Sequence, residues 1–197
     1  MNLIDRISHQ FEDNMRGTLE ALELLAAPIA GAVELITASL LDSGKVLVCS
    51  GSGSAGDARR FAAQLVNGFE LERPALAAMA LSADTSTLAP VAAELDPQAL
   101  FARQIAAFGH PGDILLTLSA NPDSARVLGA IRAAHERDMR VIALTGAHGG
   151  RTGEALGPGD ILLCAPAERT ARIQELHLLI LHCLCDGIDC LLLGVED

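Results

Sequence analysis

Residues 46–57 decide the fold class, and they run Val46-Leu47-Val48-Cys49-Ser50-Gly51-Ser52-Gly53-Ser54-Ala55-Gly56-Asp57. A continuously apolar run leads into a turn of small residues and then into a helical pattern with a Ser-x-x-Asp capping box. Such an apolar run is typical of a strand buried on both faces, as in a parallel sheet. Backbone amides at the start of the helix can bind an anion. The stretch therefore predicts a strand, a loop and a helix, with either an anion site or an ordinary capped turn between them.

The same alternation continues along the chain. Further apolar runs occupy 76–80, 114–118, 141–144 and 161–164, and helical patterns occupy 55–69, 97–108, 122–137 and 170–193. Strands that alternate with helices favour an α/β fold, here a doubly wound, flavodoxin-like parallel sheet of about five strands flanked by helices. Ligands bind beyond the carboxyl ends of such strands, so the loops to search are 50–54, 82–87, 119–124 and 145–150.

An N-terminal helical extension precedes the sheet. Residues 3–23 predict a helix with one narrow apolar stripe, and a second helix is expected from Pro28 to Gly44. Because the stripe needs a partner surface, we expect residues 1–44 to serve oligomerisation and 45–197 to form the α/β domain. The stripe consists of Ile4, Ile7, Phe11, Met15, Leu19 and Leu22.

Charge and composition restrict the partners. The 197 residues carry a net charge of −11, which disfavours direct binding to nucleic acid. Charged residues or glycines interrupt the apolar runs, so no membrane span is expected, and the N-terminus lacks a signal-peptide pattern. We therefore expect a cytoplasmic protein. The five cysteines show no CxxC spacing, which favours buried, reduced thiols over disulfides or a metal site.

The loop at 119–124 predicts a well-capped helix, with Asn121 at the N-cap and Pro122 at the first helical position. Ser119 and Ser124 offer hydroxyls to a ligand. Asp123 lies in the expected first turn, where its carboxylate would repel an incoming phosphate. This loop is therefore a weaker candidate for an anion site than residues 50–54.

The order of motifs resembles the sugar isomerase (SIS) domain family, in particular its phosphoheptose isomerase branch, and most closely a relative of that branch, the DnaA initiator-associating protein. The resemblance spans nearly the whole chain and implies a homotetramer with phosphosugar sites at the carboxyl edge of the sheet. It rests on Ser54-Ala55-Gly56-Asp57-Ala58, Phe61-Ala62-Ala63, Glu72-Arg73-Pro74-Ala75-Leu76, Ala80 to Ser86, Phe101-Ala102-Arg103-Gln104, Gly112 to Leu116, Ala143 to Gly146 with Gly149-Gly150, and Ala171 to His177.

The resemblance also implies particular roles. In the isomerase branch, a His and a Glu after the first loop join a Gln and a His of the last helix in a metal and acid/base site. The late pair is present as Gln174 and His182, whereas Arg60 and Gln64 stand at the early positions. Arginine cannot ligate a metal and glutamine cannot accept a proton. The implied substrate-binding residues are Ser52, Ser54, Asp84, Thr85, Ser119, Asn121, Ser124 and Gln174.

Three functions therefore stay open. The main prediction is a protein without enzymatic activity that gathers copies of the replication initiator DnaA, binding it through Leu192 and Leu193 in a C-terminal run that resembles the initiator-associating protein. The alternative is an isomerase that converts sedoheptulose 7-phosphate to D-glycero-D-manno-heptose 7-phosphate in lipopolysaccharide heptose synthesis. Only that alternative needs a cofactor, zinc. The third is a phosphosugar sensor without turnover. His182 fits a hydrogen-bonded cleft residue, and His177 a solvent-facing neighbour.

Overall fold

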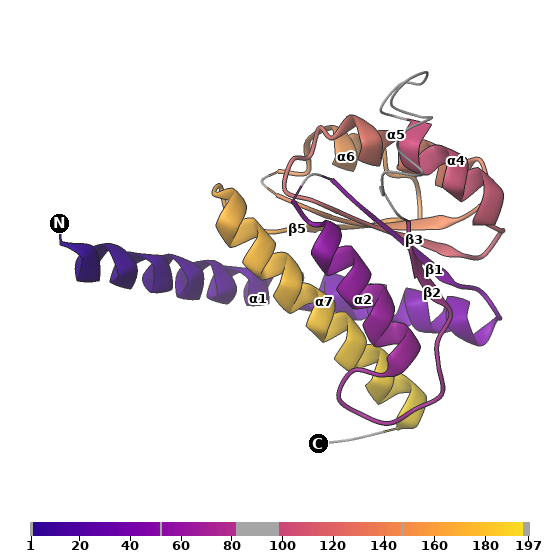
Figure 1. Ribbon diagram of the computed structural model, residues 1–197, viewed down its shortest axis with the longest axis horizontal. Helices are drawn as coiled ribbons and strands as arrows, with labels where there is room; N and C mark the ends of the chain where they lie inside the picture. The colour runs from indigo at the N-terminus through magenta and orange to yellow at the C-terminus, as the bar shows by residue number, and fades with distance from the viewer. Residues whose placement is uncertain (1, 52, 82–98, 147, 195–197) are drawn as a thin grey trace.

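The computed structural model describes residues 2–51, 53–81, 99–146 and 148–194 (Figure 1). The chain runs through helices and strands in the order α1 (Leu3–Leu41), β1 (Val46–Ser50), α2 (Ala55–Asn67), β2 (Ala78–Ala80), α4 (Ala99–Phe108), β3 (Ile114–Ser119), α5 (Ala125–His135), β4 (Arg140–Thr145), α6 (Gly150–Glu154), β5 (Ile161–Cys164) and α7 (Thr170–Leu193).

The strands form one parallel, five-stranded sheet in the order β2-β1-β3-β4-β5. The central strands β1 and β3 are buried along their whole length, as their continuous apolar sequences predict. This order confirms the doubly wound α/β fold and places the carboxyl ends of β1, β3 and β4 side by side.

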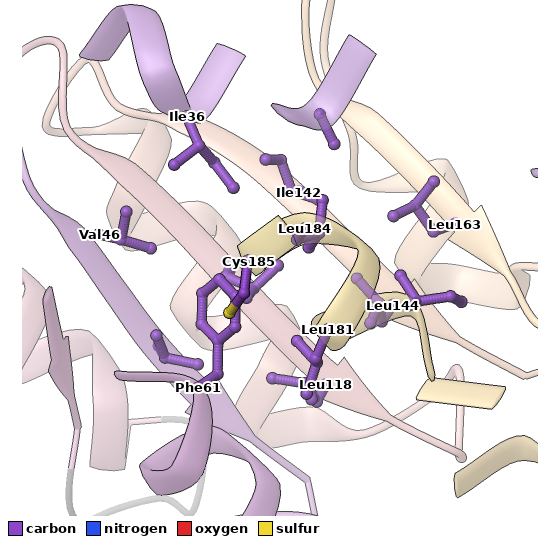
Figure 2. Close-up of a cluster of buried hydrophobic side chains, with 14 of the residues drawn as sticks. Ile36, Val46, Phe61, Leu118, Ile142, Leu144, Leu163, Leu181, Leu184 and Cys185 are labelled. Carbon is purple, nitrogen blue, oxygen red and sulfur yellow. The ribbon is translucent and has the colours of Figure 1, made fainter. Parts of the chain in front are cut away.

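Helices cover both faces of the sheet. On one face α1, α2 and α7 pack over alternate strand residues, and Figure 2 shows Leu184 beside Ile142 and Leu181 beside Leu118. The other face is covered by α4 and α5, whose buried side chains include Phe101 and Ile131 (Figure 1). At about 25 cal/mol per Å² of buried apolar surface, these two layers dominate the stability of the fold.

The N-terminal extension is one helix rather than the two expected. Pro28 lies inside α1 and cannot donate a hydrogen bond to Leu24, but Leu24 is exposed, so water can satisfy its carbonyl. The helix continues because its second half packs against α7 and the sheet through Ala32 and Ile36. Its first half projects past the sheet, and the whole predicted apolar stripe is exposed there (Figure 1).

Three polar contacts hold this projecting half against the start of α7. Arg172 donates to the backbone carbonyl of Gln10 at 2.6 Å, and Asn14 donates to Glu175 at 2.6 Å. Arg169 also pairs with Asp13 at 3.2 Å. The direction of the projecting half is therefore fixed by the body of the protein rather than by helix propensity alone.

Two expectations from composition need correction. By length and composition α1 and α7 could each span a membrane, although both bury one face in the core, as helices of globular domains do. None of the five cysteines forms a disulfide, but they are not all buried as expected: Cys183 and Cys190 are exposed and Cys164 is half-buried. Only Cys49 and Cys185 are buried core residues.

Candidate active site

The loops after β1 and β3 touch at the carboxyl edge of the sheet. The amide of Gly51 donates to the carbonyl of Leu118 at 2.8 Å. A Cβ on Gly51 would lie only 2.4 Å from Oγ of Ser119, so a larger residue cannot occupy this position without a shift. The structure thus brings the first predicted loop together with Ser119, and with Ser124, whose Oγ lies 3.5 Å from the same Cβ position.

The first loop also contacts the last helix. Gly53 has φ +93°, and a Cβ there would lie 2.8 Å from Nε2 of Gln174. A left-handed backbone and the absence of a side chain are both required for this approach. The predicted grouping of the first loop with Gln174 is therefore present in the structure.

Several buried polar groups near this edge make no hydrogen bond within the described residues. They include Oγ of Ser54, which is the N-cap of α2. The expected capping box is wrong, because Ser54 has φ −109° and ψ 13° and its side chain does not bond the helix. A buried hydroxyl without a partner is costly, and such groups are typical of sites that bind a ligand or water.

His177 belongs to the same buried set and is not the solvent-facing residue expected. It is 1% exposed, and neither ring nitrogen makes a hydrogen bond of normal geometry within the described residues. Burial lowers the pKa of His177, while the backbone carbonyl of Thr145 and the carboxylate of Asp57 favour its charged form. Burial has the larger effect, so the charged form of this ring beneath the carboxyl edge is disfavoured relative to a histidine in water.

The loop after β3 differs from its predicted capping. Helix α5 starts at Ala125 with Ser124 as the N-cap, because Asn121 instead accepts from the amide of Asp123 at 2.9 Å. The carbonyl of Pro122 accepts from both the amide and Oγ1 of Thr152, at 3.0 and 2.6 Å, so both of its lone pairs are used outside a helix. Asp123 accepts from the amide of Arg151 at 3.1 Å, so its carboxylate is bound at the start of α6.

Helices α2 and α7 lie side by side beyond the loop (Figure 1). Sγ of Cys185 donates to Oε1 of Gln64 at 3.8 Å, and burial raises the pKa of this thiol to about 12. The ring of His182 stacks on Phe69 with centroids 5.3 Å apart. His182 is half-buried, and the stacking fixes its ring at the α2 side of α7.

A buried ion pair joins these two segments more firmly. The guanidinium of Arg73 pairs with Asp189 and also donates to the backbone carbonyls of Gln64 and Leu65 at 3.0 and 2.7 Å. Both side chains are nearly inaccessible, at 1% and 3% exposure. Arg73 therefore closes the end of α2 and ties it to α7.

Of the predicted site residues, Ser54, Ser119, Ser124 and Gln174 lie together around the first loop, and His182 lies further along α7. Asn121 is exposed in the neighbouring loop. Ser52, Asp84 and Thr85 lie outside the described residues. Sequence reasoning missed the burial of His177 and the pairing of Arg73 with Asp189; the one available signal was that charged and imidazole groups interrupt otherwise apolar surroundings.

The metal implied by the family resemblance does not fit the residues of this chain. Within the described ranges, no three His, Cys, Asp or Glu side chains come close enough to hold an ion. Around α2 and α7, Arg60 has no lone pair to donate, Gln64 is neutral and already accepts from Cys185, and the Cys185 thiol is protonated. Zinc is held by three or four imidazole, thiolate or carboxylate ligands, and His182 is the only one of the four implied positions that supplies such a group.

Comparison with known proteins assigns the class. The SIS domain family model matches residues 10–146. Over all 197 residues the chain is 64% identical to the phosphoheptose isomerase of Aromatoleum aromaticum and 61% identical to that of Azoarcus sp., with 100% of each chain covered.

Solved structures agree with this similarity. The phosphoheptose isomerase of Neisseria gonorrhoeae has a TM-score of 0.89 at 42% identity, covering 95% of this chain and 99% of its own. That of Francisella tularensis has a TM-score of 0.91 at 41% identity, covering 96% and 99%. The fold and the edge site define a SIS-domain protein. Within that class, the chain belongs to the phosphoheptose isomerase family.

These findings correct the main functional prediction. The full-length relatives are phosphoheptose isomerases at up to 64% identity, which contradicts the expectation of a DnaA-binding protein without enzymatic activity. The structure also places Leu192 partly inside the core, while Leu193 is 41% exposed. Similarity of the C-terminal run was misleading because much of that run packs inside the shared fold, where the residues are fixed by the core rather than by a partner.

Proposed function

We propose that the protein is a ketose–aldose isomerase that converts sedoheptulose 7-phosphate to D-glycero-D-manno-heptose 7-phosphate. The observation that carries this proposal is the full-length similarity to phosphoheptose isomerases, together with Gln174 beside the carboxyl-edge loop and His182 about two turns further along α7. The family membership supports a phosphorylated sugar as the ligand.

The loop after β1 suits the phosphate of such a substrate. It leads into α2, a helix of 13 residues whose first amides point to the edge of the sheet, and the positive end of a helix favours an anion. The buried, unpartnered hydroxyl of Ser54 is available as a further donor. Because Asp123 is held at α6, its carboxylate opposes phosphate less than its sequence position indicates.

His182 is the group suited to move the proton. Isomerisation removes a proton from C1 of the ketose, forms an enediolate across C1 and C2, and returns a proton to C2 as the oxygen on C1 becomes the aldehyde. An imidazole titrates nearest to neutral pH, so it can both accept and return this proton. Stacking on Phe69 orients the ring, and Gln174, about two helical turns away, binds the substrate nearer its phosphate.

We also propose that the protein works as a homotetramer in the cytoplasm, with residues 1–44 as the assembly segment and 45–197 as the SIS domain. The exposed stripe on α1 supports this assembly. So does an apolar groove of about 550 Å³ between α1 and α7, whose lining includes Leu22, Ile29, Leu179 and Leu191. Surfaces of this kind are usually covered in solution.

The test is incubation with sedoheptulose 7-phosphate in deuterated buffer, followed by proton NMR of the sugar. We expect aldose signals and deuterium at C2. The His182→Asn variant should lose activity by about 10²-fold or more, whereas His9→Asn, an exposed residue on α1, should not. Binding of the sugar without exchange or product would contradict the proposal and favour a sensor.

A further inference from the structure

The contacts between α2 and α7 fix which of their residues share a level. The backbone of Gly53 lies against the side-chain amide of Gln174, and Gln64 accepts a hydrogen bond from Cys185. Gly53 precedes Gln64 along the chain, as Gln174 precedes Cys185, so α2 and α7 run in the same direction (Figure 1). Arg60 lies about one turn before Gln64 on α2, and His182 lies about one turn before Cys185 on α7. Arg60 therefore lies level with the turn of α7 that carries His182.

Positions 60 and 64 of α2 carry charges opposite to those of the site that the family resemblance implies. That site has a His at position 60 and a carboxylate at position 64, whereas this chain has a guanidinium and a neutral amide. An acidic pocket for a divalent cation is thus replaced by one with a permanent positive charge. Arg60 is exposed, so a substrate at the α2–α7 surface can reach it.

We propose that the reaction site of this chain holds no divalent metal ion and that the guanidinium of Arg60 supplies the positive charge beside His182. The proposal rests on the isomerase function proposed above. An enediolate carries oxygens on two adjacent carbons, and the fork of N–H donors on a guanidinium suits such a pair. Arg60 stabilises the charge that develops on these oxygens while His182 moves the proton, and no electron or group leaves the substrate.

Metal content tests the first half of the proposal without any substrate. Protein stripped with a chelator is equilibrated with zinc, desalted and measured by mass spectrometry of the metal. Wild type should retain far less than one zinc per chain. Arg60→His combined with Gln64→Glu should raise this to one, because it restores ligands opposite Gln174 and His182.

The matched control is Arg59→His combined with Gln64→Glu, which adds the same groups but turns the imidazole about 100° around the helix. It should stay free of zinc. One tightly held zinc per wild-type chain would overturn the proposal. So would a double variant at 60 and 64 that folds, as judged by circular dichroism, and still takes up none.

Turnover tests the second half. A chelator should leave the activity of the wild type unchanged, and Arg60→Ala should lower kcat by about 10²–10³-fold. Arg60→Lys should restore part of this loss. Unchanged kcat in Arg60→Ala would overturn the role of Arg60. If the wild type turns over no heptose phosphate, the isomerase function itself fails, and the zinc measurement still decides the metal content.

Discussion

The backbone of Gly53 lies directly against the amide of Gln174, so that a Cβ at position 53 would stand 2.8 Å from Nε2. This contact couples the loop after β1 to the last helix of the fold. A substrate held by the loop is therefore placed against α7, and a change in the loop backbone must also displace Gln174.

Gly53→Ala should weaken both stability and substrate binding. The residue has φ +93°, which costs an L-residue about 1–2 kcal/mol, and the new methyl group would displace the Gln174 amide. We expect a lower midpoint in urea denaturation and a raised KM for the heptose phosphate.

Gly56→Ala is the matched control, since its Cβ would meet nothing within 4 Å and lies in the first turn of α2. Alanine is the better helix former, so this variant should be stabilised by about 0.5–1 kcal/mol. Equal midpoints and equal KM for the two variants would show that the loop is not strained at Gly53.

The sheet was predictable because its central strands are buried on both faces. Apolar runs such as residues 114–118 are typical of such strands, and α7 was predicted with its observed bounds. Local signals failed where tertiary contacts overrode them. Pro28 did not divide α1, since packing on α7 holds both halves in line, and Asn121 capped its own loop rather than a helix.

The site was predictable only in its loops. Turn residues after strands point to the carboxyl edge from sequence alone, and this correctly grouped Ser119 with the first loop. Arg73 and Asp189 are 116 residues apart, and no local pattern indicates that they pair. The environment of His177 likewise depends on Asp57 and Thr145, which reach it only through the fold.

Removal of one partner of the Arg73–Asp189 pair should be strongly destabilising. Asp189→Ala would leave a guanidinium at 1% exposure without its counter-charge, and breaking such a buried pair costs about 3–5 kcal/mol. Urea denaturation measures the difference. Arg16→Ala, which removes the exposed pair with Asp13 and leaves Asp13 paired with Arg169, should cost about 1 kcal/mol or less. Similar losses in the two variants would mean that the buried pair is solvated.

His177 should make stability depend on pH on the acidic side of neutrality. Burial lowers the pKa of the folded ring, while an unfolded histidine titrates near pH 6.5. The unfolded chain therefore binds the proton first as the pH falls. The contribution of His177 to the free energy of unfolding therefore has its full value above about pH 6.5. As the pH falls from there toward the pKa of the folded ring, this contribution is lost by at most about 1.4 kcal/mol per pH unit.

The control for this titration is the exposed His9. Urea denaturation of wild type, His177→Gln and His9→Gln at several pH values separates the two histidines. His177→Gln should flatten the dependence below about pH 6.5, and His9→Gln should preserve it. An unchanged slope in His177→Gln would assign the pH dependence to another group.

The exposed stripe on α1 should hold the subunits together. Ile7 and Phe11 are 49% and 68% exposed on the half of α1 that projects beyond the sheet, where only a second chain can cover them. Replacing both by Asp would bury charges without partners in the assembly, so the tetramer should dissociate. Light scattering at micromolar concentration measures the mass.

Leu41→Asp is the control, because Leu41 is 72% exposed at the opposite end of the same helix and off the stripe. A wild-type mass near 20.5 kDa would contradict the assembly outright, and dissociation by Leu41→Asp alone would move the interface away from the stripe.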